Sequence, residues 1–336
     1  MSLNIISFTE NGIRTSLKTA GAMKDTDVRL YTKWSGFDKK DFGTDIVMVN
    51  ESISDWATGM MREKQSLLFI GACGIAVRAI APGINSKLTD SPVLVMDELG
   101  KYVIPILSGH IGGANRLAFA VSDAIGAQSV ITTATDINYV FAVDVWAKDN
   151  GLSIVNKDGI AKVSSKVLKG EKVSILKDKG TADVVVTDEP EKISDDEALL
   201  ILKPKEYVIG AGCKKDKDPA EFEAFINETL SENGIKVEDV FVISSIDLKK
   251  DEKAFLSYSR RHGIPFMTFT SDDLEAVQGD FSSSDFVKEM TGVDNVCERA
   301  AVKACGDGGS LIIKKVSKDG MTIAIARRDW RKNLNL

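Results

Sequence analysis

Short apolar runs alternate with segments of helical spacing along the N-terminal part of the chain. Apolar runs bounded by glycine, proline or acidic residues predict buried strands, and the segments between them predict helices. The predicted strands are residues 4–8, 28–31, 46–49, 67–70, 92–96, 102–107 and 130–134. The predicted helices are residues 13–20, 52–64, 75–80 and 115–125, the second of them capped by Ser52 or Ser54. This alternation favours a largely parallel sheet covered on both faces.

The same alternation returns in the C-terminal part of the chain. Strands are predicted at 207–213, 240–244 and 265–269, and helices at 219–230, 250–261 and 296–304. Two further apolar runs, 311–316 and 321–326, flank Ser317-Lys318-Asp319-Gly320 and predict a hairpin. We therefore expect a second α/β domain here.

Between these two parts, residues 156–203 are rich in Lys, Asp, Glu and Val and contain few aromatic side chains. Their charge runs are typical of a solvated face. The fold class expected is α/β, with N- and C-terminal α/β domains of largely parallel sheet joined by a small middle segment. The predicted boundaries are 1–145, 146–205, 206–331 and a tail at 332–336, and the basic run 327–332 is expected to be disordered.

Composition restricts the classes of partner. The chain has 336 residues, 43% of them hydrophobic and 27% charged, with a net charge of −6. This charge gives no support to a nucleic-acid or anionic-membrane partner, although a local basic pocket can still hold a small anion. No apolar run approaches membrane-spanning length, and residues 1–8 lack the layout of a signal peptide, so a cytoplasmic location is expected. The four cysteines form no C-x-x-C pair, so we expect reduced thiols and no protein metal site.

The run Ser108-Gly109-His110-Ile111-Gly112-Gly113-Ala114-Asn115 carries the most chemistry. It lies between a predicted strand and a predicted helix. Glycines at such a junction let backbone N–H groups approach a bound anion, and the helix start adds unpaired donors. His110 is one of only two histidines, and an ordinary histidine pKa of about 6.5 suits a general acid or base. The pattern predicts an anion site with a titratable group, in which the N–H groups of Gly112 and Gly113 hold an oxyanion or a carboxylate.

Polar residues also follow other predicted strands. They include Cys73 and Gly74, the pair Asp97-Glu98, and Thr133 with Asp136. The carboxyl ends of strands are where open α/β sheets bind ligands. Structural interpretations stand beside this one: Asp97-Glu98 fits a hairpin turn better, and Asp136 fits a helix cap equally well.

Three charged side chains on predicted helices are equally open to two interpretations. Arg78 lies on an apolar helix, where it either binds a carboxylate or faces solvent. Glu298 and Arg299 lie inside an apolar helix, where a structural ion pair is at least as good an interpretation as substrate contact.

Several of these runs together resemble one family. The runs GACGIAVR (71–78), SGHIGGAN (108–115) and TTATD (132–136) resemble the N-terminal domain of the cobalamin biosynthesis protein G (CbiG) family. The runs GAGC (210–213), SSIDLKKDE (244–252) and GVDNVCERAA (292–301) resemble its C-terminal domain. The resemblance follows the family's order along nearly the whole chain, and only the middle segment is weak.

The resemblance implies a cobalt-precorrin-5A hydrolase of anaerobic vitamin B12 synthesis. Such an enzyme opens a δ-lactone on a carboxylate-rich cobalt macrocycle and releases acetaldehyde. The cobalt belongs to the substrate, so no cofactor is expected. Transient contact with the methyltransferases of the pathway is expected. For this chemistry we predict His110, Glu98 and Asp136 as catalytic residues, with Asp97 as a further carboxylate to test. The predicted substrate-binding residues are Cys73, Gly74, Arg78, Ser108, Gly109, Gly112, Gly113, Asn115, Thr133, Glu298 and Arg299.

Other functional classes find less support. Neither Gly71-x-x-Gly74 nor Gly210-x-Gly212 completes a dinucleotide or P-loop motif, and G-x-S-x-G and H-E-x-x-H are missing. The remaining alternative is a corrinoid-binding carrier that assists a methyltransferase without catalysis.

Overall fold

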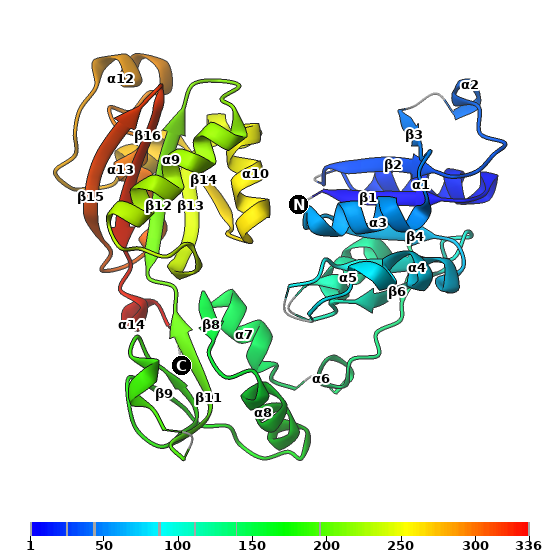
Figure 1. Ribbon diagram of the computed structural model, residues 1–336, viewed down its shortest axis with the longest axis horizontal. Coiled ribbons are helices and arrows are strands. Elements are labelled where there is room, and N and C mark those ends of the chain that lie inside the picture. The colour runs from blue at the N-terminus through cyan, green and yellow to red at the C-terminus, as the bar shows by residue number, and fades with distance from the viewer. Residues whose placement is uncertain are drawn as a thin grey trace. The chain divides into compact units, whose positions relative to one another are not determined.

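The computed structural model describes residues 2–24, 26–42, 45–86, 89–110, 112–138, 140–194 and 196–334 (Figure 1). Its internal contacts divide the chain into two units, Met1–Val145 and Trp146–Leu336. The middle segment belongs by these contacts to the second unit.

The N-terminal unit is built on a seven-stranded sheet in the order β3-β2-β1-β4-β5-β6-β7. Its strands are β1 (Leu3–Ser7), β2 (Val28–Thr32), β3 (Ile46–Met48), β4 (Ser66–Ile70), β5 (Val93–Met96), β6 (Tyr102–Leu107) and β7 (Gln128–Ser129). The expected strand at 130–134 is wrong, since the strand here is only the two residues of β7 and residues 134–137 are helical. The sheet is largely parallel, as predicted.

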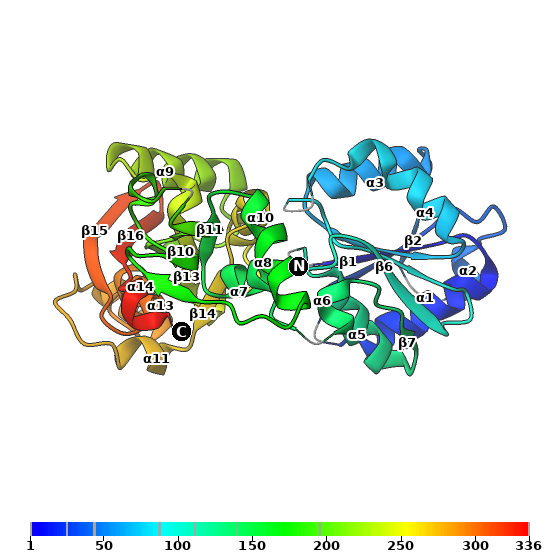
Figure 2. The same cartoon turned by 90° about the horizontal axis from the view of Figure 1, so that it is seen from below.

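Helices cover both faces of this sheet. The covering helices are α1 (Glu10–Ala22) and α5 (Ala114–Ile125) on one face, and α3 (Ile53–Arg62) and α4 (Cys73–Ile80), which a 3-10 turn at Ala81–Gly83 follows, on the other. The chain also forms the short helices α2 (Lys39–Phe42), α6 (Ala134–Ile137) and α7 (Val143–Asp149). Ile13 of α1 and Val121 of α5 pack with Leu68 on one face. Trp56 of α3 and Ala79 of α4 pack on the other, so the helices form two layers (Figure 2). Ser52 accepts a hydrogen bond from Asp55 N and caps α3, as predicted.

Strand direction changes once in this sheet. Strands β1 to β5 are parallel, but β6 runs antiparallel to β5, and β7 is parallel to β6. In the register of this pair Met96 faces Val103 and Val93 faces Leu107. The end of β6 therefore lies at the edge where the parallel strands begin.

The middle segment forms a four-stranded sheet of its own in the order β8-β11-β10-β9. Its elements are β8 (Leu152–Ile154), α8 (Asp158–Leu168), β9 (Ile175–Lys177), β10 (Ala182–Val186), a 3-10 turn at Pro190–Lys192 and β11 (Ala198–Pro204). Strands β9, β10 and β11 are parallel, and β8 is antiparallel to β11. Helix α8 approaches β11 closely, because a Cβ on Gly159 would lie 2.3 Å from the Leu199 carbonyl oxygen.

The C-terminal sheet has the order β14-β13-β12-β16-β15. Strands β12 (Tyr207–Cys213), β13 (Val240–Ile246) and β14 (Phe266–Phe269) are parallel. The hairpin of β15 (Ser310–Lys318) and β16 (Met321–Arg327) extends the sheet, with β16 antiparallel to both β12 and β15. Its helices are α9 (Pro219–Glu232), α10 (Lys253–His262), α11 (Ser271–Glu275), α12 (Asp285–Thr291) and α13 (Cys297–Cys305), with 3-10 turns at Val237–Asp239 and Asp247–Lys249. The predicted hairpin and the predicted fold class are confirmed.

Helices α9 and α10 cover one face of this sheet, and α13 covers the other. The packing of α13 on β12 requires glycine at position 210. A Cβ there would lie 1.8 Å from the carbonyl oxygen of Cys297. Gly210 therefore lets the first turn of α13 rest directly on the strand.

The basic run near the C-terminus is ordered, so the expected disorder is wrong. Residues Trp330–Asn333 form α14, and Trp330 is only 2% exposed. Arg331 forms ion pairs with Asp178 and Asp188 of the middle segment. Burial of an indole ring and pairing across segments hold this run in place.

Candidate active site

The loop between β6 and α5 closes on itself. Ala114 N donates to Ser108 O at 3.0 Å and Asn115 N donates to Gly109 O at 2.9 Å. Ser108 and Gly113 have positive φ angles of 57° and 87°, which reverse the backbone. Ile111 lies outside the described residues.

Gly112 is required by the same closure. A Cβ at this position would lie 2.2 Å from Cβ of Ser108 and 2.7 Å from its carbonyl oxygen. The expected oxyanion donor at Gly113 is not supported, because its N–H donates to His110 O at 2.9 Å. The loop thus uses this backbone group to hold His110 in place.

His110 lies between two carboxylates. Its Nε2 is 2.8 Å from Oδ2 of Asp136, and its Nδ1 is 3.5 Å from Oδ2 of Asp144. The Asp136 side chain is 32% exposed, whereas those of His110 and Asp144 are 16% and 13% exposed. Asp136 therefore forms the solvent-facing side of the cluster and Asp144 the buried side.

The contacts within this cluster shift the pKa values of His110 and Asp144. The hydrogen bond from His110 to Asp144 is the main cause that raises the pKa of His110, and the charges of both carboxylates add to it against the opposing effect of burial. Burial acts to raise the pKa of Asp144, but the His110 ring and the Val145 N–H outweigh it and lower that pKa. The imidazolium form of His110 is thus favoured, which suits a proton donor.

Asn115 orients the exposed carboxylate. Its Nδ2 donates to Oδ2 of Asp136 at 2.5 Å and to Oγ1 of Thr133 at 3.0 Å. Oδ1 of Asn115 and Oγ of Ser108 are buried without a hydrogen bond in the described part of the chain. Buried polar atoms normally have a partner, so these two atoms are exceptions within the loop.

Glu98 lies away from this cluster. It belongs to the turn between β5 and β6, where Asp97 accepts hydrogen bonds from the N–H groups of Leu99, Lys101 and Tyr102. Its own Oε2 accepts a 2.6 Å hydrogen bond from Thr9 Oγ1. The hairpin-turn interpretation is confirmed, and strand β6 separates Glu98 from the His110 loop by roughly 17 Å.

Cys73, Gly74 and Arg78 lie at the Glu98 edge of the sheet. All three are exposed on α4, which starts where β4 ends, and Arg78 Nη1 donates to Gly74 O at 3.1 Å. Strand order reverses between β1 and β4, so this is the edge at which doubly wound sheets bind ligands. The structure therefore divides the predicted residues between two edges rather than one.

Glu298 and Arg299 hold loops in the C-terminal domain. The fully buried Glu298 carboxylate accepts from Ser282 N, Ser282 Oγ, Asn295 Nδ2 and Lys315 N. Arg299 pairs with Asp294 at 2.9 Å and stacks over Phe281. They do not pair with each other, and their polar groups are already used, so their predicted substrate contact is not supported.

Three of the four thiols are shielded and weakly acidic. Cys297 and Cys305 are buried and Cys213 is half-buried, and burial raises their pKa values to about 11, 12 and 11 respectively. Within the described residues no group of three or more His, Cys, Asp or Glu is placed to hold a metal ion. Nor does any helix in that part of the chain have the length and apolar character needed to cross a membrane.

Comparison with known proteins assigns the chain. Residues 55–136 match the family model for the cobalamin synthesis G N-terminus and residues 207–326 that for its C-terminus. A cobalt-precorrin-5A hydrolase of Salmonella typhimurium is 30% identical over 77% of this chain and 81% of its own length. The chain belongs to the CbiG family. Its homologues named as hydrolases make it a hydrolase of cobalamin biosynthesis.

The chain is also similar to the following proteins. The cobalt-precorrin-5A hydrolase of Priestia megaterium is 29% identical and covers 96% of this chain and 94% of its own length. Among solved structures, a cobalamin biosynthesis protein G homologue from Sulfolobus solfataricus is 21% identical, with a TM-score of 0.38 over 98% of this chain and 97% of its own. CobE, also solved, is 27% identical over 36% of this chain and 89% of its own, with a TM-score of 0.34.

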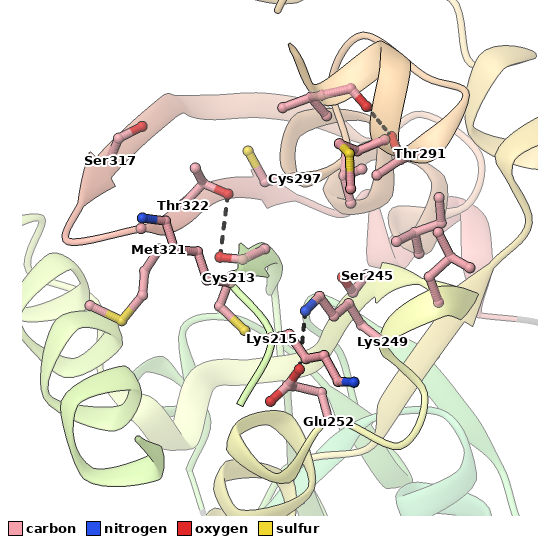
Figure 3. Close-up of a pocket in the computed structure, with 18 of the residues that line it drawn as sticks. Cys213, Lys215, Ser245, Lys249, Glu252, Thr291, Cys297, Ser317, Met321 and Thr322 are labelled. Atoms are coloured by element: carbon pink, nitrogen blue, oxygen red, sulfur yellow. Dashed lines mark hydrogen bonds and ion pairs between the residues drawn. The ribbon is translucent and has the colours of Figure 1, made fainter. Parts of the chain in front are cut away.

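Two features of this CbiG chain were missed from its sequence. Asp144 carries no local signal, since it lies at the start of α7 and reaches His110 only through the fold. The other is a cavity of about 850 Å³ in the C-terminal domain, at the ends of β12 and β13 (Figure 3). The sequence feature that could have indicated this cavity is a pair of lysines after each of these strands, Lys214-Lys215 and Lys249-Lys250.

Proposed function

We propose that this chain opens the δ-lactone of cobalt-precorrin-5A with water and releases acetaldehyde to give cobalt-precorrin-5B. The names of its full-length relatives supply the substrate. The observation in the chain itself that carries the proposal is the His110 imidazole held between Asp136 and Asp144 beside a glycine loop. Cobalt enters as part of the substrate.

Lactone opening needs a base for water and an acid for the leaving oxygen. Asp136, the more exposed carboxylate, is placed to take a proton from water. The water oxygen adds to the carbonyl carbon and the ring C–O bond breaks. His110 exchanges the hydrogen bond of its Nε2 to Asp136 for one to the departing oxygen and donates that proton, while Nδ1 stays on Asp144. Asp144 holds the ring and favours its charged form.

Acetaldehyde release then needs no oxidant. The hydroxyl formed on the two-carbon unit gives up its proton as the bond to the macrocycle breaks. The electron pair of that bond passes into the conjugated macrocycle, which takes up a proton. After donating its first proton, His110 is in the form that can accept the hydroxyl proton.

The test is acetaldehyde release from enzymatically prepared cobalt-precorrin-5A, followed through an alcohol dehydrogenase that oxidises NADH. We expect His110→Ala to lower the rate by about 10²- to 10⁴-fold, the usual contribution of a positioned acid or base. The matched control is His262→Ala. His262 pairs with Glu223 in the C-terminal domain and should be dispensable for turnover.

Retention of full activity by His110→Ala would remove this site from the reaction. Tight binding of cobalt-precorrin-5A without release by the wild type would instead favour the carrier function.

A further inference from the structure

The C-terminal cavity lies outside the residues that the proposed reaction uses. It opens where β12 and β13 end side by side, with the start of β16 and the first turn of α13 as further walls (Figure 3). Its volume of about 850 Å³ falls within the range of ligand pockets, roughly 300–1,000 Å³. Parallel strands bind ligands at this edge.

The cavity concentrates positive charge on an acidic chain. Six lysines line it against four acidic side chains, although the net charge of the chain is −6; the lysines are Lys214, Lys215, Lys249, Lys253, Lys315 and Lys318. Lys249 pairs with Glu252 at 3.0 Å, and Lys318 pairs with Glu228 at 2.6 Å. The other four form no ion pair within the described residues, which leaves their ammonium groups able to bind an anion.

Apolar side chains form the other lining of the cavity. Ile246, Val287, Val296 and Met321 contribute to its walls. At its rim, Leu248 is 67% exposed and Met290 is 64% exposed. Large apolar side chains exposed together at the mouth of a pocket mark a binding surface for an apolar body. An inorganic anion would leave this surface unused.

The walls are fixed before any ligand arrives. The main chain of Lys315 is anchored by its N–H bond to the buried Glu298 carboxylate at 2.7 Å. Ser245 Oγ donates to Ala211 O at 2.8 Å and ties β13 to β12. Gly210 sets α13 against β12, and so places Cys297 in the wall. A preformed site loses less entropy on binding.

We propose that this cavity binds an amphipathic polycarboxylate, with its apolar body against Leu248 and Met290 and its carboxylates on Lys215, Lys253 and Lys315. A cobalt corrinoid with carboxylate-bearing edges has this chemistry. The identification of the ligand as a cobalt corrinoid rests on the proposed function. It implies that the C-terminal domain binds the substrate. The His110 cluster would then carry the chemistry alone.

The probe is cobyrinic acid, a cobalt corrin that carries free carboxylates, and its fully methyl-esterified form is the uncharged control. Binding to the full chain is measured by isothermal titration and by the change in the visible spectrum. We expect the combined change Lys215→Glu and Lys315→Glu to weaken binding of the acid about 10-fold or more and to reduce its dependence on salt. Met290→Glu, at an exposed position, should weaken it as well.

The matched control is Lys236→Glu. Lys236 is an exposed lysine that precedes β13, at the opposite edge of the same sheet. It carries the same change of charge, and we expect unaltered affinity. Circular dichroism melting of each variant checks that the fold is retained.

Binding and turnover separate the two proposals. Lysine-dependent binding of the acid without acetaldehyde release from cobalt-precorrin-5A would overturn the proposed function and leave the cavity assignment standing. Failure of the wild type to bind cobyrinic acid would overturn the cavity assignment even if acetaldehyde is released. Equal affinity for the acid and its ester, or unchanged affinity in the double lysine variant, would also overturn it.

Discussion

Asp144 faces the ring nitrogen of His110 that Asp136 does not contact, with Nδ1 and Oδ2 separated by 3.5 Å. The histidine is therefore held through both nitrogens, by one carboxylate on its buried side and one on its exposed side. This arrangement stabilises the imidazolium and fixes the plane of the ring. The cluster joins three separate segments, since His110 follows β6, Asp136 lies in α6 and Asp144 in α7.

The charge state of His110 gives the first prediction. With only two histidines in the chain, its titration can be followed by NMR, and His262→Ala assigns the remaining signal. We expect the pKa of His110 to lie above its unfolded value of about 6.5. Its contribution to the stability of the N-terminal unit is then complete below the unfolded pKa and is lost as pH rises through the folded pKa. A pKa below 6.5 would contradict the two-carboxylate geometry.

Asp144→Asn tests the positioning of that histidine. Loss of the buried charge should lower the pKa of His110 and move the alkaline limb of the pH–rate profile to lower pH, because the imidazolium is the acid. Asp144→Glu should restore part of the shift. A lower rate with an unmoved profile would indicate a purely structural role for Asp144.

Gly112→Ala tests the closure of the catalytic loop. The added methyl group would lie 2.2 Å from Cβ of Ser108, so the loop must shift and carry His110 with it. We expect acetaldehyde release to fall at least about 10-fold, since misplacement by about 1 Å has large effects on rate. Gly59→Ala is the matched control: its Cβ meets nothing within 4 Å, and alanine inside α3 should raise stability by about 0.5–1 kcal/mol.

Glu98→Gln tests the division of the predicted residues between two sheet edges. Glu98 bonds Thr9 at the far end of β6 from His110. We expect turnover within about twofold of the wild type, as is usual for a change remote from the reacting groups. A loss comparable to that of His110→Ala would show that the Glu98 edge takes part in the reaction.

Glu298→Ala tests the buried carboxylate at the start of α13. Its removal leaves four donors without their acceptor, and each unsatisfied buried group costs about 1–3 kcal/mol. We expect the free energy of unfolding to drop by about 3 kcal/mol or more in urea titrations. Glu228→Ala removes a half-exposed partner of Lys318 and should cost less than about 1 kcal/mol.

Much of the fold is predictable from pattern alone. The apolar-rich runs of β1 and β4 indicate buried strands, and the structure buries every residue of both and places them at the centre of the sheet. The direction of β6 follows from Asp97-Glu98-Leu99-Gly100, because a loop this short joins only antiparallel strands. In such a hairpin Glu98 precedes β6 and His110 follows it, so the two residues lie at opposite edges of the sheet.

The site was less predictable for a physical reason. His110 follows the end of β6, and Asn115 and Asp136 lie in the first turns of α5 and α6, which are places where sequence pattern points to ligands. Asp144 lies in no such motif and contacts His110 only after 34 residues have folded back. Glu298 and Arg299 were predicted to bind substrate but bind loops of the chain instead. A charged side chain on an apolar helix indicates that it has a polar partner, but the sequence does not say whether that partner is a loop or a substrate.

Gly210 bears on the C-terminal cavity although it does not line it. The missing side chain lets α13 lie directly against β12, and the position of that helix places Cys297 in the wall and Glu298 beside the main chain of Lys315. Gly210 thus fixes the position of the cavity wall that α13 supplies. A side chain at position 210 would force α13 away from β12 and displace that wall without a change in any residue that lines the cavity.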